Sequence, residues 1–139
     1  MAISQGMCIS FKKEVLLGEQ DFDADTFKIA LFTSVASLSN GTTVYSTSGE
    51  VSGVGYTAGG NILTGVTVTT DGSVAIVDFS DSSWTSATFN TRGALIYNSS
   101  RSNTAVAVLD FGGDKTVENG TFTVQFPAAA ATTAIIRLT

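Results

Sequence analysis

The residues that could carry out chemistry are few. The chain has no histidine and a single cysteine, Cys8. Without imidazole, a serine or cysteine nucleophile lacks its usual base, and the commonest metal ligand is missing. A hydrolase would then need lysine as its base, and the lysines stand in ordinary polar contexts. We therefore predict a protein that is not an enzyme and holds no cofactor, with Cys8 as a small buried residue.

Carboxylates are the remaining candidates. Glu14, Glu19, Glu50 and Glu118 show no spacing that indicates a catalytic pair. Two strand-like segments end in Asp-Phe and are followed by a second aspartate, which gives the pairs Asp78/Asp81 and Asp110/Asp114. Such pairs can bind calcium, but a calcium site takes about six to eight oxygen ligands, and neither stretch is that rich in them. We predict no metal site; the alternative role is that each aspartate hydrogen-bonds its own backbone where the strand ends.

Aromatic side chains could serve recognition instead of catalysis. Carbohydrate-binding β modules stack exposed aromatic rings on sugars, and Tyr56 and Trp84 are the candidates for such a role here. Packing in the core is the default expectation for Trp84 and Phe89, because aromatic residues dominate small β cores. Tyr56 lies in a glycine-rich segment, so we expect it at a contact surface.

Length and composition limit the partners. The chain has 139 residues, which suits one domain, and 43% hydrophobic against 14% charged residues indicates that it folds. The net charge of −5 would repel a phosphate backbone, so nucleic acid is not an expected partner. No apolar run approaches the ~20 residues that span a bilayer, and we expect neither a membrane segment nor a signal peptide.

The N-terminal segment differs from the rest. Met7, Phe11 and Val15 recur at four-residue spacing, and Gly18 follows where a helix C-cap would stand. This pattern predicts a short amphipathic helix over residues 5–17, or alternatively an extended arm that docks on a neighbouring subunit. We assign residues 1–24 to this helix or docking arm and residues 25–139 to a β-sandwich domain.

After residue 25 the sequence turns to β-branched and aromatic runs separated by turn residues. Strands are predicted at 26–34, 74–79, 93–97, 105–111, 121–126 and 134–138, with weaker ones at 43–46 and 62–69. About eight strands predict an all-β, single-domain sandwich, jelly-roll-like in type. The last strand either closes a sheet or leaves an edge for another chain.

Turn residues divide these strands. Asn40-Gly41, Asp71-Gly72 and Asn119-Gly120 predict tight turns, the last two as hairpins. Residues 48–60 contain five glycines, so they are expected to form a long surface loop.

Several segments carry a resemblance to a known family. They are residues 11–22 (FKKEVLLGEQDF), 25–33 (DTFKIALFT), 50–60 (EVSGVGYTAGG), 92–98 (RGALIYN) and 109–115 (LDFGGDK). Together they resemble small virion proteins of tailed bacteriophages, over nearly the full chain from residue 11. The resemblance implies a capsid cement or decoration protein and carries no active-site residues. A tail or fibre component, possibly a receptor- or glycan-binding β module, is the alternative.

This resemblance sets the expected partners and location. We expect the protein to bind the major capsid protein and itself as a homo-oligomer, on the capsid surface of the virion, after synthesis in the host cytoplasm. The candidate partner contacts are Phe11, Val15, Leu16, Leu17, Tyr56 and Trp84.

Overall fold

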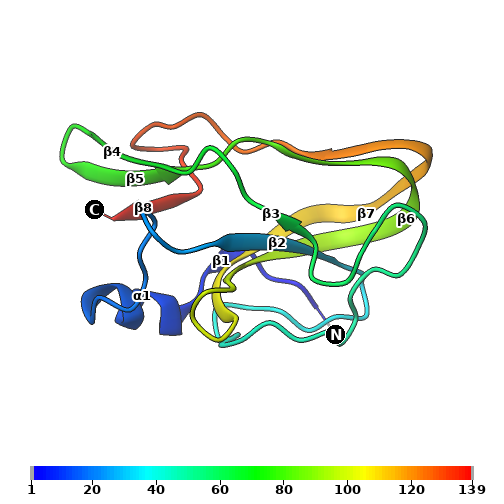
Figure 1. The fold of residues 1–139 in the computed structure, drawn as a ribbon, viewed down its shortest axis with the longest axis horizontal. Helices are drawn as coiled ribbons and strands as arrows, with labels where there is room; N and C mark the ends of the chain where they lie inside the picture. Colours follow the sequence, from blue (N-terminus) through cyan, green and yellow to red (C-terminus); the bar gives the residue numbers. More distant parts are fainter. Residues whose placement is uncertain (1, 139) are drawn as a thin grey trace.

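Eight strands and one short helix are present in residues 2–138, the part of the chain that the computed structural model describes (Figure 1). The helix is α1 (Ile9–Leu16). No helix within these residues is long and apolar enough to cross a membrane. The strands are β1 (Gly6–Met7), β2 (Phe27–Phe32), β3 (Asn61–Ile62), β4 (Thr67–Asp71), β5 (Val74–Asp78), β6 (Ser82–Asn98), β7 (Thr104–Val124) and β8 (Ile136–Leu138).

The larger sheet has the strand order β1-β7-β6-β2-β3, and the smaller one has the order β4-β5-β8. All neighbouring strands are antiparallel. The prediction of an all-β, sandwich-like domain is thereby confirmed. Within the larger sheet, β2 lies in the strand predicted at 26–34, pairs with β6 over its whole length and is buried except at the half-buried Lys28.

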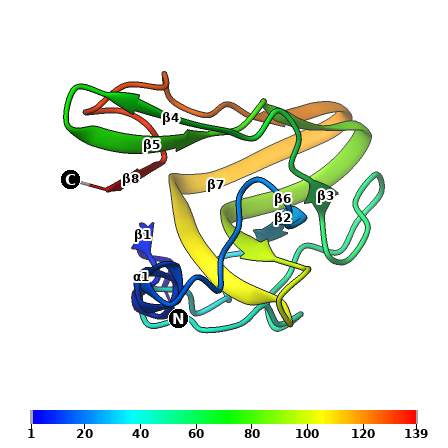
Figure 2. The same cartoon turned by 60° about the vertical axis from the view of Figure 1, so that its left-hand side comes forward.

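β6 and β7 form one long hairpin that takes part in both layers of the sandwich (Figures 1 and 2). Its register shifts at several places, including between Thr91, which pairs with Lys115, and Gly93, which pairs with Asp110; such irregularities bend a strand. The hairpin loop is formed by residues 99–103, and Ser102 and Asn103 have positive φ there. Because of this hairpin, the strands predicted at 93–97, 105–111 and 121–126 are parts of two long strands.

The predicted hairpin turn at Asn119-Gly120 is wrong. Asn119 has a φ of +46°, but it lies inside β7, where Ala87 pairs with Gly120 and Phe89 pairs with Val117. Two residues of β7 therefore face one residue of β6, which is the arrangement of a β-bulge. A residue type that tolerates positive φ suits a bulge as well as a turn.

The smaller sheet agrees better with the turn prediction. β4 and β5 are joined by Gly72-Ser73, and Gly72 has a φ of +61°, so the predicted turn at Asp71-Gly72 is confirmed to within one residue. The strand predicted at 62–69 is split between β3 and β4, and residues 43–46 form only an isolated bridge at Val44. β8 is the predicted last strand; Thr139 lies outside the described residues.

Aromatic rings fill the space between the layers. Phe22 stacks on Phe27 with ring centroids 4.4 Å apart, and Phe11 meets Phe22 edge-on at 5.9 Å. Toward the far end, Trp84 and Phe89 of β6 lie 6.2 Å and 5.7 Å from Phe122 of β7. A further contact, between Phe22 and Phe79 at 6.3 Å, joins the first group to the residue that follows β5 of the smaller sheet.

Of the two alternatives for the N-terminal segment, the structure contains the helix. α1 ends before Gly18, which has a φ of +72°, as the C-cap prediction required. Cys8 and Phe11 are buried in the common core. The segment is thus packed onto the β layers within one chain.

Candidate interaction surfaces

The outer face of α1 carries large apolar side chains. Ile9, Leu16 and Leu17 are 58%, 88% and 60% exposed. Ile9 and Leu16 are seven positions apart, so they share one side of the helix, with the exposed Lys12 and Lys13 between them. We call these five residues the α1 surface. Exposed apolar groups gathered on one element mark a contact surface, because covering them removes apolar area from water.

An apolar cavity of about 190 Å³ lies between α1 and the smaller sheet. Its lining consists of Phe11, Val15, Gln20, Phe22, Val68, Ala75, Ile76, Val77, Ile136 and Leu138. Val68 and Leu138 also remain about half exposed, so the apolar lining continues onto the molecular surface. An apolar cavity of ~150 Å³ can hold a molecule as large as benzene. This one is therefore large enough for an aliphatic side chain from another molecule.

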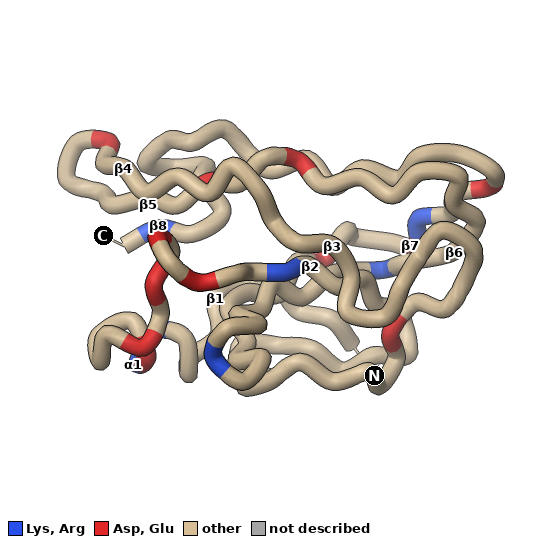
Figure 3. Tube along the Cα trace, viewed as in Figure 1, with Lys and Arg blue, Asp and Glu red and all other residues tan. Residues whose placement is uncertain are grey.

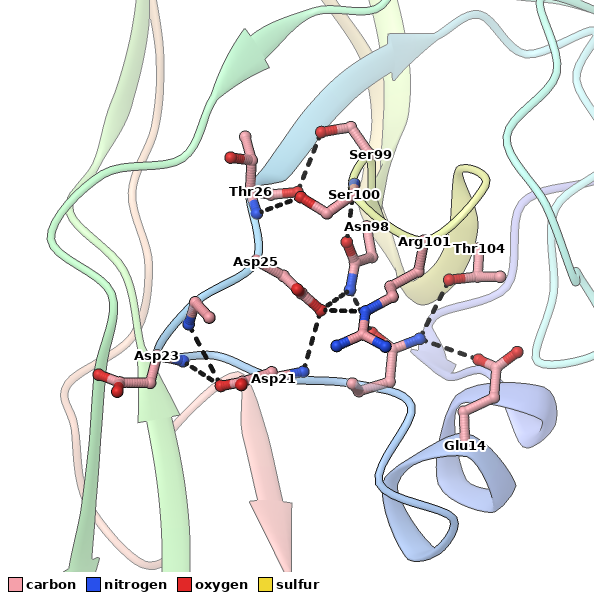
Figure 4. A network of polar contacts seen from close by, with 12 residues as sticks. Glu14, Asp21, Asp23, Asp25, Thr26, Asn98, Ser99, Ser100, Arg101 and Thr104 are labelled. Carbon is pink, nitrogen blue, oxygen red and sulfur yellow. Dashed lines mark hydrogen bonds and ion pairs between the residues drawn. The ribbon is translucent and has the colours of Figure 1, made fainter.

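A network of polar side chains fixes the chain that follows α1 (Figure 4). The amide of Gln20 donates to Glu14 at 2.9 Å and to Thr104 at 3.1 Å. The fully buried Asn98, at the end of β6, donates to the side-chain oxygen of Gln20 at 2.8 Å and to Asp25 at 2.8 Å. The helix, the turn after it and the β6–β7 hairpin are thereby held in one geometry.

Asp25 is the centre of this network. Its carboxylate also accepts the Nε–H of Arg101 at 2.9 Å and the backbone N–H of Asp21 at 3.1 Å. Burial would raise the pKa of Asp25, but the hydrogen bonds from Asn98, Arg101 and Asp21 outweigh it and hold the pKa below its ordinary value. Asp25 is therefore a structural carboxylate that is ionised at neutral pH.

A second polar cluster surrounds Glu50. Its carboxylate accepts the hydroxyl of Tyr45 at 2.6 Å, the hydroxyl of Tyr56 and the backbone N–H of Gly59 at 2.8 Å. Tyr97 of β6 donates to the carbonyl oxygen of Gly59 at 2.7 Å. All three tyrosines of the chain thus converge on one short segment. Protein groups thus occupy the carboxylate of Glu50, while Tyr97 of β6 and the bond from the N–H of Leu31 to Tyr56 anchor residues 48–60 to the larger sheet.

The same cluster shifts the ionisation of the tyrosines. Burial and the charge of Glu50 raise the pKa of Tyr97 to about 12. The pKa values of Tyr45 and Tyr56 are also raised, first by burial and then by their hydrogen bonds to Glu50. These phenols stay protonated at neutral pH and act as hydrogen-bond donors.

The loops around this cluster form a surface with almost no charge. Between Lys28 and Asp71 the only charged residue is Glu50, whose carboxylate is bound internally. We call residues 33–60 the neutral loops; Figure 3 shows them almost without charged positions. Val35, Val44 and Val54 are 64%, 48% and 68% exposed there, among serine, threonine and glycine. Such a surface loses little solvation of charge when a partner covers it.

The predicted contact residues are divided by the structure. Leu16 and Leu17 are exposed on the α1 surface, and Val15 lines the cavity. Phe11 and Trp84 are only 1% and 4% exposed, which corrects their prediction as partner contacts: each packs against other aromatic rings in the core. The rings of Phe11 and Trp84 stay in the core because full burial removes more of their apolar area from water than a contact on the surface would.

Tyr56 belongs to the neutral loops but is partly buried. Its ring lies 6.2 Å from Trp84 and 6.0 Å from Phe89, and its hydroxyl is bonded to Glu50 and to the N–H of Leu31. The two aromatics considered for sugar stacking therefore pack on each other inside the domain. The Glu50 cluster was not predicted: Tyr45, Glu50 and Tyr56 are close in the chain but have no regular spacing, and the bonds to Tyr97 and Leu31 form only through long-range folding.

The remaining reactive groups have structural roles. Asp110 accepts the N–H of Gly112 two residues on, so it binds its own backbone as predicted, although it lies inside β7 and not at a strand end. Asp81 follows β5 but accepts the N–H of Phe126, which is distant in the chain, so the prediction of a local backbone bond is wrong for Asp81. Within residues 2–138, no three acidic or cysteine side chains gather as metal ligands would.

Cys8 is fully buried, and burial together with the charge of Glu14 raises its pKa to about 11, so the thiol is neutral. Ser10 and Lys13 have the Ser-x-x-Lys spacing, which can form a serine–lysine pair in hydrolases. Here the Ser10 hydroxyl is buried without a hydrogen-bond partner among residues 2–138, and Lys13 is exposed. The two side chains do not form a pair.

Comparison with known protein families, with characterised proteins and with solved structures gives no match to this chain.

Proposed function

We propose that this chain is a non-enzymatic structural protein of the virion of a tailed bacteriophage, a cement or decoration protein that binds the major capsid protein. The observation that carries the proposal is the neutral loops. They present exposed valines in a surface whose single carboxylate is turned inward. The segmental resemblance to phage virion proteins supplies the setting in which such a surface would be used.

Physical reasoning supports adhesion through this surface. A protein that coats a shell needs many weak, shape-based contacts, and charged side chains at the centre of an interface are costly to desolvate. The neutral loops avoid that cost. Their internal anchoring by Glu50, Tyr56 and Tyr97 keeps the surface in one shape before binding, which reduces the entropy lost on association.

The test introduces charge at the centre of the proposed contact. Val35→Asp and Val54→Asp are each made at exposed positions of the neutral loops, with Thr121→Asp, exposed on β7, as the matched control. Purified protein is added back to phage particles that lack it, and the copies bound per particle are counted. We expect wild type and Thr121→Asp to reach hundreds of copies on the shell and both valine variants to bind at least about tenfold less.

Other outcomes decide against the proposal. A few copies located on the tail would overturn the capsid role and favour a tail or fibre component. Equal binding by the valine variants would exclude the neutral loops as the contact. Deletion of residues 2–17 is not an informative test, because it would remove Cys8 and Phe11 from the core.

A further inference from the structure

We propose that the α1 surface is an isologous interface: two copies of this chain pack their α1 helices antiparallel about a two-fold axis near Leu16. Each copy places its Leu16 and Leu17 against the mouth of the other copy's apolar cavity. The inference rests on the proposed function only in that a decoration protein acts in many copies. It is tested on purified protein, so its failure is distinguishable from failure to bind the capsid.

Apolar matching supports this interface. Leu16 and Leu17 protrude directly after Val15, which lines the cavity, and Val68 and Leu138 extend the apolar lining outward. A single copy therefore carries a protruding apolar pair next to an apolar hollow. A two-fold axis is the arrangement in which each copy uses both features at once, since the same surface then meets itself.

Charge complementarity selects a second copy as the partner. Lys12 and Lys13 precede Leu16 on the exposed side of α1, and the exposed Glu19 and Asp23 follow it. α1 ends at Leu16, so the basic half lies on the helix and the acidic half on the turn that follows it. A two-fold axis near Leu16 brings the basic half of one copy against the acidic half of the other, and the same contact repeats on the other side of the axis. A basic half and an acidic half flanking an apolar centre form a self-complementary surface.

The acidic half is held in place before any contact forms. Asp21 accepts the backbone N–H groups of Asp23 and Ala24 at 2.9 Å and 3.2 Å, and Asp25 accepts the N–H of Asp21 (Figure 4). Gln20 and Asn98 connect this turn to the sheet. The turn after α1 therefore has a fixed geometry, so little entropy is lost when its charges meet a partner.

The experiment is a charge exchange measured by sedimentation equilibrium. One variant carries Lys12→Glu and Lys13→Glu; the other carries Glu19→Lys and Asp23→Lys. All four positions are exposed, so both variants should fold, which far-ultraviolet circular dichroism and Trp84 fluorescence verify. Each variant alone places like charges across the axis, and we expect its self-association to weaken about 100-fold against wild type at low salt.

Mixing the two variants gives the decisive result. In a mixed pair every contact again joins opposite charges, so an equimolar mixture should form a one-to-one heterodimer although neither variant dimerises alone. A Leu16→Ser/Leu17→Ser variant should be monomeric in every combination, while the Val35→Ser/Val44→Ser control should dimerise like wild type. A monomeric wild type, a closed ring of three or more copies, or a mixture that does not associate would overturn the proposal.

Discussion

At the scale of a single residue, the hydroxyl of Tyr56 connects the neutral loops to β2. It donates to Glu50 in the neutral loops and accepts the N–H of Leu31, near the end of β2. Leu31 is fully buried, so its N–H has no access to water if this partner is removed. We predict that Tyr56→Phe lowers the free energy of unfolding by about 1–3 kcal/mol, the cost of an unsatisfied buried donor.

Tyr45→Phe is the matched control for this prediction. Tyr45 also donates to Glu50, at 2.6 Å, and the backbone N–H beside its hydroxyl, that of Gly59, keeps Glu50 as its acceptor at 2.8 Å when the hydroxyl is removed. Its loss should therefore cost less, about 0.5–1.5 kcal/mol. Urea unfolding of both variants measures the difference, and equal losses would show that the bond to Leu31 adds nothing.

Ionisation of the tyrosines gives the alkaline limit of stability. Their pKa values are raised in the folded protein, that of Tyr97 to about 12, whereas unfolded tyrosine titrates near its ordinary value of about 10. Below pH ~10 both states are protonated and stability is unaffected; above it the unfolded state releases protons first, so stability falls as pH rises toward 12. Tyrosinate absorbance should appear together with loss of the circular dichroism signal. Titration of any tyrosine while the protein remains folded near pH 10 would contradict this.

At the scale of elements, the sequence patterns predicted the elements whose formation depends on neighbouring residues. β2 follows from its apolar run, α1 from four-residue spacing and the β4–β5 turn from Gly72. The long β6–β7 hairpin could not be predicted in this way, because a β-bulge and a tight turn both favour a residue such as Asn119 that tolerates positive φ. The distinction depends on whether the flanking residues pair with β6, and that pairing is a long-range property.

The candidate surfaces were predicted only in part, because local patterns do not show which residues long-range contacts bury. Phe11, Val15, Leu16 and Leu17 were all predicted as contacts, but helical geometry turns Phe11 into the core and leaves Leu16 and Leu17 exposed. The sequence does not show that the carboxylate of Glu50 is bound inside the domain. Tyr97, which holds this segment, lies 47 positions after Glu50 and reaches it only when β6 pairs with β2. Residues 33–60 therefore form an uncharged surface only once the contact between Tyr97 and Gly59 has formed.

Gly60 shows how closely the neutral loops approach β2. It has a φ of +78°, and a β-carbon there would collide with the carbonyl oxygen of Ile29. Gly72, with a φ of +61°, has open space around it. We predict that Gly72→Ala costs about 1–2 kcal/mol for its backbone conformation alone, and that Gly60→Ala costs about 1–3 kcal/mol more because β2 or the loop must move. Thermal unfolding of the two variants checks this, and equal midpoints would mean that the loop yields freely.

At the scale of the whole molecule, the β6–β7 hairpin runs through both layers, and the N-terminal segment shares their core (Figure 1). Trp84 lies on the hairpin, and Cys8, fully buried beside β7, donates its backbone N–H to Val106 at 2.9 Å. Each is the only residue of its type, so each reports on one region alone. If the layers and α1 depend on one another, the domain unfolds in a single cooperative step.

We therefore predict that Trp84 fluorescence and the reactivity of Cys8 toward a thiol reagent change at the same urea concentration. The physical reason is that exposing Cys8 requires α1 to leave a core that Phe11 and Phe22 share with Phe27 of β2 and Phe79, which follows β5. Reaction of Cys8 well before the fluorescence change would show that residues 1–24 open separately, as an independent docking arm would. In that event the two-fold contact through Leu16 would have to form on a segment that is not yet folded, and mutual burial of the helices would be what folds it.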